Sequence, residues 1–261
     1  MEYKVEQLAV QIHPTREAMG QAAARLAAEF IRARAKDKDE VNVLFAAAPS
    51  QNEFLAALTA LPEIPWERVN AFQLDEYIGL PKDAPQRFSR YVEEHVVSRV
   101  PLRRFYAMDP SRDPAEECRR YAALLAQFPP DLACIGIGEN GHIAFNDPPV
   151  ADFADPLPVK VVELDLACRL QQVNDGCFAT LDDTPSHAVT LTIPTILAAK
   201  RVVCVVPGER KQEAVYKTLR GPIDTQCPAS ILRRHPGATL VVDEVAARLY
   251  LDEVKELEDR A

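Results

Sequence analysis

The order of apolar and polar residues along the chain predicts strands and helices in alternation. Continuous apolar runs such as residues 41–47 and 201–206 have the length of buried strands, whereas residues 18–35 place apolar side chains at helical spacing. The expected strands cover residues 41–47, 69–75, 105–108, 132–137, 159–164, 188–192, 201–206 and 239–242, and the expected helices cover residues 18–35, 52–59, 88–100, 114–127, 210–219 and 244–258. This alternation is typical of an α/β fold, Rossmann-like and doubly wound, with a mainly parallel sheet and helices on both faces.

Composition narrows the class of protein. With 261 residues and 48% hydrophobic content, the chain has enough apolar material for a single α/β domain over residues 1–261. A formal net charge of −9, without any block of Lys or Arg, excludes nucleic acid as the expected partner. The sequence shows neither a signal peptide nor an apolar run of membrane-spanning length, so we expect a cytoplasmic protein without a membrane partner. The six cysteines include no CxxC pair, which argues against structural zinc and a disulfide framework.

One glycine-rich turn carries the strongest chemical signal. The apolar run that begins at Leu132 ends in Gly136, Gly138 and Gly141, and His142 follows directly. Groups at the carboxyl ends of parallel strands face the ligand crevice, so His142 is the leading catalytic candidate. A nearby carboxylate, at Asp147, can orient an imidazole and stabilise its charged form.

Two further strand ends carry charged residues. Asp75 and Glu76 follow an expected strand, where one carboxylate could act as a general base, although Asp is also a common capping residue. Lys211 follows another strand at a helix start that could hold an anionic group, although a surface lysine on a helix is more common. For the Asp75–Glu76 pair and for Lys211, the functional and the structural interpretation both stay open.

Together these segments resemble the glucosamine-6-phosphate deaminase family, which shares a Rossmann-like fold with the 6-phosphogluconolactonases. The family motif Leu-Asp-Glu-Tyr-x-Gly stands at residues 74–79, and Gly-x-Gly-x-Asp-Gly-His-Ile-Ala-Phe-Asn-Glu is matched by residues 136–147. An Ala-x-Thr segment at residues 188–192 and a Gly-x-x-Lys turn at residues 208–211 follow in the family's order. The ending Ile-Ala-Phe-Asn favours the deaminase branch over the lactonase branch.

The resemblance implies conversion of a 2-amino-2-deoxy-hexose 6-phosphate to a ketose phosphate and ammonia, without cofactor or metal. In that reaction His142 would open the sugar ring and Asp75 would remove the proton from C2 to give an enediol-type intermediate. Asp147 and Asn140 match the network around the histidine. The substrate, a sugar or sugar phosphate, would be bound by a set of residues from the matching loops: Ala47, Ala48, Ser50, Gln51, Glu76, Gly141 and Lys211.

The chain also departs from the family pattern. Asn140 stands where the family has aspartate, and it could accept a hydrogen bond from the imidazole without offsetting its charge. Asp147 is one methylene shorter than the family's glutamate. Residues 47–50 replace a glycine-rich phosphate loop, and Gly176 replaces an arginine, which weakens the phosphate site and indicates a shifted substrate.

Two alternatives follow from these departures. One is a related sugar isomerase, epimerase or lactonase-like hydrolase with an altered, non-phosphorylated substrate. The other is a catalytically impaired sugar-binding homologue. The family includes both monomers and hexamers, so a homo-oligomer is one of the two assemblies that the resemblance implies.

Overall fold

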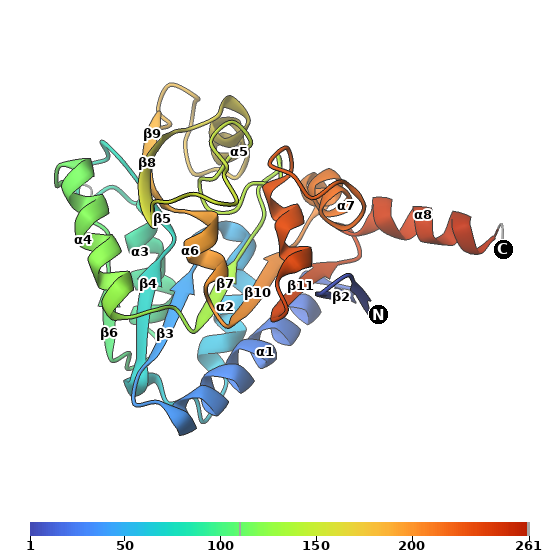
Figure 1. Cartoon of the computed structure of the whole chain (residues 1–261), viewed down its shortest axis with the longest axis horizontal. Helices are drawn as coiled ribbons and strands as arrows, with labels where there is room; N and C mark the ends of the chain where they lie inside the picture. Colours follow the sequence, from blue (N-terminus) through green and yellow to red (C-terminus); the bar gives the residue numbers. More distant parts are fainter. Residues whose placement is uncertain (110, 260–261) are drawn as a thin grey trace.

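An eight-stranded sheet runs through the molecule (Figure 1). The computed structural model describes residues 1–109 and 111–259, so residues 110, 260 and 261 of the expected domain lie outside the described part. Neighbouring strands in the sheet are parallel except for the hairpin of β1 and β2. The spatial order is β1 (Glu2–Val5), β2 (Leu8–His13), β11 (Ala238–Asp243), β10 (Arg201–Val206), β7 (Leu132–Ile135), β3 (Val41–Phe45), β4 (Val69–Gln73) and β6 (Arg104–Tyr106).

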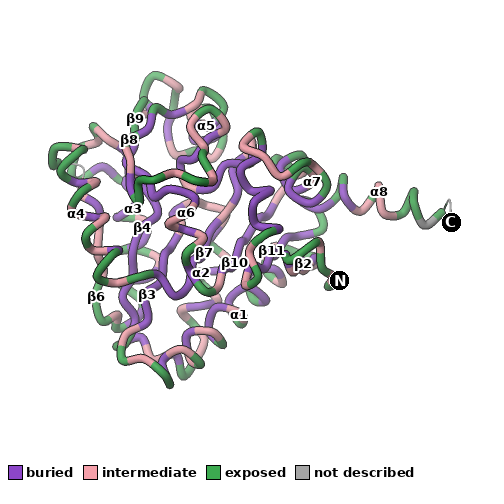
Figure 2. Tube along the Cα trace, viewed as in Figure 1, coloured by how far each residue is buried: buried purple, intermediate pink, exposed green. Residues whose placement is uncertain are grey.

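Helices cover both faces of this sheet, and each face has its own apolar core. One face packs against α1 (Arg16–Asp37), α2 (Asn52–Ala60) and α3 (Phe88–Val92). The other packs against α4 (Pro114–Gln127), α6 (Ile193–Leu197), α7 (Gln212–Arg220) and the start of α8 (Arg248–Glu258). The central strands are therefore buried on both sides (Figure 2), and the predicted α/β fold is confirmed.

The first helix shows how the local sequence builds this arrangement. The side chain of Thr15 accepts a hydrogen bond from the backbone N–H of Ala18 at 3.1 Å, which caps the start of α1. Its buried stripe is made largely of alanine, so the helix approaches the sheet and α2 closely. Gly20 is required at that contact, because a Cβ there would lie 2.7 Å from the backbone carbon of Glu53.

A second, three-stranded sheet, separate from the mainly parallel one, was not predicted. It consists of β5 (Asp75–Tyr77), β9 (His187–Leu191) and β8 (Val159–Glu163), all antiparallel. In β8 the side chains of Val161 and Glu163 are exposed, as expected for a sheet with one face toward solvent. Helix α5 (Leu166–Asn174) lies in the connection between β8 and β9.

Smaller differences occur at element boundaries. The β1–β2 hairpin was not predicted, and the expected helix over residues 88–100 is α3 followed by a π-helical turn, η3 (Glu93–Val97). The terminal helix begins at Arg248 rather than at Glu244. Short 3₁₀ turns occupy η1 (Pro49–Gln51), η2 (Trp66–Arg68), η4 (Glu209–Lys211) and η5 (Pro228–Arg234). Among the described residues, no helix combines the length and apolarity that a membrane crossing requires.

The two sheets meet at the carboxyl edge of the parallel one. The chain leaves β4 at Gln73 and enters β5 at Asp75, so this aspartate begins the second sheet instead of ending a strand over residues 69–75. The segments that follow β3, β7 and β10 reach the same edge. This is where an open parallel sheet binds its ligands.

Candidate active site

A cavity of about 520 Å³, counted out to its open mouth, lies at this edge. Its walls come from the segments after β3, β4, β7 and β10, together with α5. Most of the predicted site residues line it: Ala47, Ala48, Ser50, Gln51, Asp75, His142 and Lys211. The imidazole and the carboxylate, 67 positions apart in the chain (142 − 75), therefore face one space.

The glycine turn fixes where His142 lies. A Cβ built on Gly138 would be 2.2 Å from Cε1 of His142, so the imidazole packs directly on the glycine backbone. The N–H of Gly138 donates to the carbonyl of His142 at 2.9 Å and closes the turn. Ala144, in the cavity wall, has a φ of 50°, a conformation that non-glycine residues seldom adopt and that is common at functional sites.

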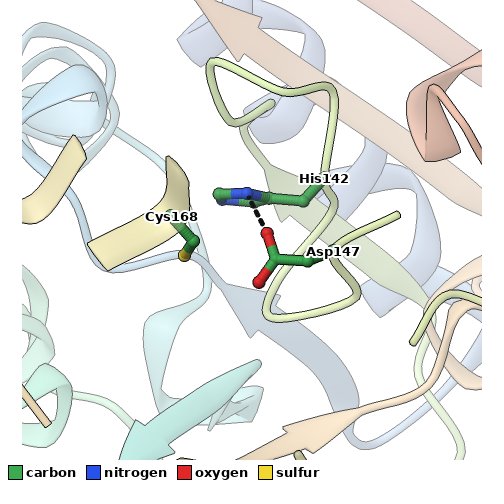
Figure 3. A group of neighbouring side chains, drawn as sticks. All are labelled: His142, Asp147 and Cys168. Atoms are coloured by element: carbon green, nitrogen blue, oxygen red, sulfur yellow. Dashed lines mark ion pairs between the residues drawn. The ribbon is translucent and has the colours of Figure 1, made fainter. Parts of the chain in front are cut away.

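His142 is paired with Asp147 behind the cavity wall (Figure 3). Its Nδ1 lies 2.8 Å from Oδ1 of Asp147, in a direction that departs from a straight N–H···O hydrogen bond. Burial raises the pKa of Asp147, but the charge of His142 and hydrogen bonds from the surrounding groups outweigh it, and the pKa lies below its ordinary value. Asp147 is therefore a buried carboxylate that can stabilise an imidazolium.

Asn140 connects the two members of this pair. Its Nδ2 donates to Oδ1 of Asp147 at 2.9 Å, and its Oδ1 accepts the backbone N–H of His142 at 3.0 Å. The expected hydrogen bond from the imidazole ring to Asn140 is not formed, because Nδ1 of the ring faces Asp147 instead. Asn140 thus holds the turn and the carboxylate together, and it lies behind the cavity lining.

Asp75 presents a carboxyl group with an unusual environment. The residue is 7% exposed, and no described residue donates a hydrogen bond to its side chain. Burial, with Glu76 and Asp147 nearby, raises the pKa of Asp75 well above its ordinary range. A carboxylate that is poorly solvated and free of partners is a stronger base than one in water, which suits proton removal from carbon.

Glu76 and Gly141 do not line the cavity, and the structure gives them other tasks. The carboxylate of Glu76 accepts backbone N–H groups from Phe88 at 3.0 Å and Ser89 at 3.0 Å, so it caps the start of α3. Gly141 has a φ of 85°, and a Cβ there would lie 2.7 Å from Sγ of Cys227. Their assignment to substrate binding stays a prediction.

The cavity lining contains a cationic side chain, Lys211, as well as the acidic Asp75. Lys211 is 7% exposed, and no described residue forms an ion pair or hydrogen bond with its ammonium group. Burial lowers the pKa of Lys211, against the attraction of Asp175 and Glu139. Lys211 is the one cationic side chain among the described cavity-lining residues, so an anionic group entering here would find a single full charge.

Uncharged polar groups surround that lysine. The Nε2 of Gln51 donates to the carbonyl of Val205 at 3.2 Å and to Oγ of Ser50 at 3.1 Å. The Oε1 of Gln51 is buried and accepts no hydrogen bond from a described residue. Ser50 and Gln51 therefore add uncharged polar groups to the cavity lining that includes Lys211, which suits a ligand rich in hydroxyl groups.

Sequence reasoning missed the contribution of α5. Gln171 and Gln172 both line the cavity, and Gln171 accepts the backbone N–H of Glu139 at 2.8 Å. Cys168, on the same helix, lies behind the wall beside Asp147 (Figure 3). Two glutamines and a cysteine in a short amphipathic segment carry no motif, so only the packing of α5 over the sheet edge identifies them. Gly176, which replaces the family's arginine, has open space around its Cα and does not line the cavity.

Comparison with known proteins gives a consistent picture at the level of sequence. The family model described as glucosamine-6-phosphate isomerases/6-phosphogluconolactonase matches residues 14–152 and 167–241. A glucosamine-6-phosphate deaminase from Exiguobacterium sibiricum is 40% identical over 188 residues, which is 72% of this chain and 73% of that protein. One from Listeria innocua is 36% identical over 211 residues, 80% of this chain and 88% of that protein.

Solved structures agree with the fold. A monomeric glucosamine-6-phosphate deaminase superposes with a TM-score of 0.84 at 31% identity and covers 92% of this chain and 99% of that chain. A 6-phosphogluconolactonase from Thermotoga maritima has a TM-score of 0.73 at 20% identity, covering 90% of this chain and 99% of that chain. The second likeness bears on the fold alone.

Proposed function

Because the chain belongs to the glucosamine-6-phosphate isomerase/6-phosphogluconolactonase family, we propose that it is an amino-sugar phosphate deaminase and isomerase. The substrate is a 2-amino-2-deoxy-hexose 6-phosphate such as glucosamine 6-phosphate, and the products are a ketose phosphate and ammonia. The observation that carries this proposal is the shared cavity of Asp75 and His142, with Lys211 in the same lining.

The cavity has the charge distribution that this substrate needs. Its reactive end places Asp75 in the cavity, with Asp147 behind His142, so a protonated amine at C2 would meet negative charge there. Lys211, whose ammonium group has no partner within the described part of the chain, would receive the terminal phosphate. A neutral sugar would interact less favourably with both the acidic residues and Lys211 than an amino-sugar phosphate does.

The residues then take complementary roles in moving protons. His142 passes a proton between the ring oxygen and the hemiacetal hydroxyl as the pyranose opens, while Asp147 stabilises the imidazolium form. Asp75 removes the proton from C2, and the electrons form an enediol-type intermediate. Protonation at C1 leaves an imine at C2, to which water adds, and ammonia departs as the ketose forms.

A second candidate keeps this chemistry but changes the end group of the sugar. Only one cationic side chain lines the cavity among the described residues, and Ala47, Ala48, Ser50 and Gln51 form the wall beside it. Alanines restrict the positive φ angles through which a loop turns several N–H groups toward one phosphate. A sugar whose terminal group is uncharged or singly charged would suit this wall.

Assays on three substrates separate these candidates. Coupled detection of ammonia and ketose is followed with glucosamine 6-phosphate and with glucosamine, and hydrolysis is followed with 6-phosphogluconolactone. The proposal expects ammonia and ketose in equal amounts from glucosamine 6-phosphate, and loss of both in Asp75→Asn. Activity on glucosamine alone would support the second candidate, whereas lactone hydrolysis without ammonia release would overturn the deaminase proposal. A cytoplasmic location and assembly as a homo-oligomer stay predictions.

A further inference from the structure

Cys168 lies next to the His142–Asp147 pair but has no part in the proposed reaction (Figure 3). One donor atom from each of these three residues lies within 4.8 Å of the others, and all three residues are buried. The thiol comes from α5, whereas the imidazole and the carboxylate come from the turn after β7. We propose that His142, Asp147 and Cys168 form a binding site for one thiophilic divalent cation of the Zn²⁺ class, and that its occupancy blocks the catalytic histidine.

The donor set is the first support for this site. An imidazole nitrogen, a carboxylate oxygen and a thiolate sulfur are the three ligand types that Zn²⁺ takes in proteins. Three protein ligands leave one coordination position, which a water molecule can take. Tetrahedral ligands at zinc bond lengths are about 3.3–3.8 Å apart. The widest donor spacing, up to 4.8 Å, therefore has to close by roughly 1 Å, and the 2.8 Å between Nδ1 of His142 and Oδ1 of Asp147 has to open by about 0.5 Å.

The second support is the state of the His142 nitrogen that faces Asp147. Its Nδ1 is buried and has no aligned hydrogen-bond partner among the described residues, although Oδ1 of Asp147 is 2.8 Å away. In the neutral imidazole the ring proton faces the carboxylate on Nδ1, so a metal that binds Nδ1 requires this proton to move to Nε2. A cation inserted here would convert the off-line contact into two coordinate bonds.

The third support is the charge around the thiol. The buried thiol of Cys168 lies near the carboxylates of Asp147 and Asp75. Those carboxylates repel a thiolate but attract a dication, so binding of the metal and loss of the thiol proton favour each other. When Zn²⁺ binds, the S–H bond of Cys168 breaks, the sulfur coordinates the metal and one proton leaves to solvent.

Binding is tested on the full chain without reference to activity. Titration of metal-free protein with Zn²⁺ by calorimetry gives the stoichiometry, and Cd²⁺ reports thiolate ligation through its ultraviolet charge-transfer absorption. Three proteins are compared: the wild type, Cys168→Ser and the matched control Cys177→Ser, which removes a half-buried thiol close by in the chain. Mg²⁺ serves as the cation that lacks affinity for sulfur.

We expect one Zn²⁺ per chain in the wild type and in the control. In Cys168→Ser we expect affinity at least about tenfold weaker and loss of the Cd²⁺ absorption. Equal affinity of the wild type and Cys168→Ser, absence of binding, or loss of the signal only in Cys177→Ser would each overturn the site. The second part of the proposal, that bound Zn²⁺ blocks His142, rests on the proposed function. It is tested by measuring whether Zn²⁺ inhibits ammonia release and whether EDTA reverses this inhibition. A protein that binds Zn²⁺ but never releases ammonia in EDTA would refute the proposed function and leave the metal site standing.

Discussion

Replacing Asn140 by aspartate tests the hydrogen-bond network behind His142, the proposed catalytic histidine. The Nδ2 of Asn140 donates to Oδ1 of Asp147 at 2.9 Å, and Asp147 is 1% exposed. Asn140→Asp removes that donor and places a second carboxylate at the same short distance. Although this change restores the residue that the resembled family carries, we expect it to destabilise this chain.

The size of the effect follows from two competing costs. Two carboxylates about 3 Å apart repel by about 6 kcal/mol at an effective dielectric constant of about 20. Protonating one of them at pH 7, from an ordinary pKa near 4, costs about 4 kcal/mol. Protonation is therefore the cheaper outcome, and the new O–H···O hydrogen bond returns about 1–2 kcal/mol. The net loss is about 2–3 kcal/mol in the free energy of unfolding at pH 7.

The sign of the pH dependence is fixed by the same reasoning. The shared proton binds the folded variant at a higher pKa than the unfolded chain, so the variant loses stability as the pH rises. Relative to the wild type, the variant's loss in the free energy of unfolding shrinks by about 1.4 kcal/mol for each pH unit below 7. It approaches zero near about pH 5. Urea unfolding of both proteins between these pH values measures it.

A double substitution supplies the control. Asn140→Asp with Asp147→Asn exchanges the amide and the carboxylate, so one donor and one acceptor again face each other and most of the lost stability should return. Equal stability of the wild type and Asn140→Asp at pH 7 and above, or a double variant no more stable than the single one, would refute the network described here.

Other substitutions probe the cavity itself. Asp75→Asn should lower kcat/KM by about 10²–10⁴-fold. In the wild type, kcat/KM should fall with decreasing pH at a pH above the ordinary carboxyl range, because burial and two neighbouring carboxylates raise the pKa of the base and only its ionised form reacts. Lys211→Met should raise KM for the sugar phosphate about 10–100-fold in steady-state assays and leave KM for the unphosphorylated sugar unchanged; an equal rise for both would contradict its assigned role. Gly138→Ala should displace the imidazole of His142 and lower kcat about 10²-fold, with circular dichroism confirming the fold.

Sequence patterns predicted the elements that carry the parallel sheet because their hydrophobic signals are strong and local. The run at residues 201–206 matches β10, and the helix expected over residues 114–127 has the same bounds as α4. Residues 159–164 were predicted as a strand, which β8 confirms, but the sequence did not indicate that this strand joins the second sheet. A short apolar run is equally compatible with either sheet, and its partner is chosen by contacts distant in the chain, here with β9.

The sequence predicted those site residues that belong to recognisable motifs. His142, Asp75 and Lys211 each follow a strand, and the fold brings all three to one cavity. Glu76 shares a motif with Asp75 but points toward the start of α3, because adjacent residues on a strand face opposite sides. The cavity wall formed by α5 could not be predicted, since it depends on how that helix packs over the sheet edge.

The central claim is that Asp75 removes the proton from C2 of a sugar whose ring His142 has opened in the same cavity. Turnover of glucosamine 6-phosphate in deuterated water, followed by nuclear magnetic resonance, tests it most directly. We predict solvent deuterium in the ketose product at C1, ammonia in equal amount, and loss of both in Asp75→Asn and in His142→Asn. Product formation at the wild-type rate in Asp75→Asn, or the absence of both ammonia and exchange in the wild type, would contradict the claim.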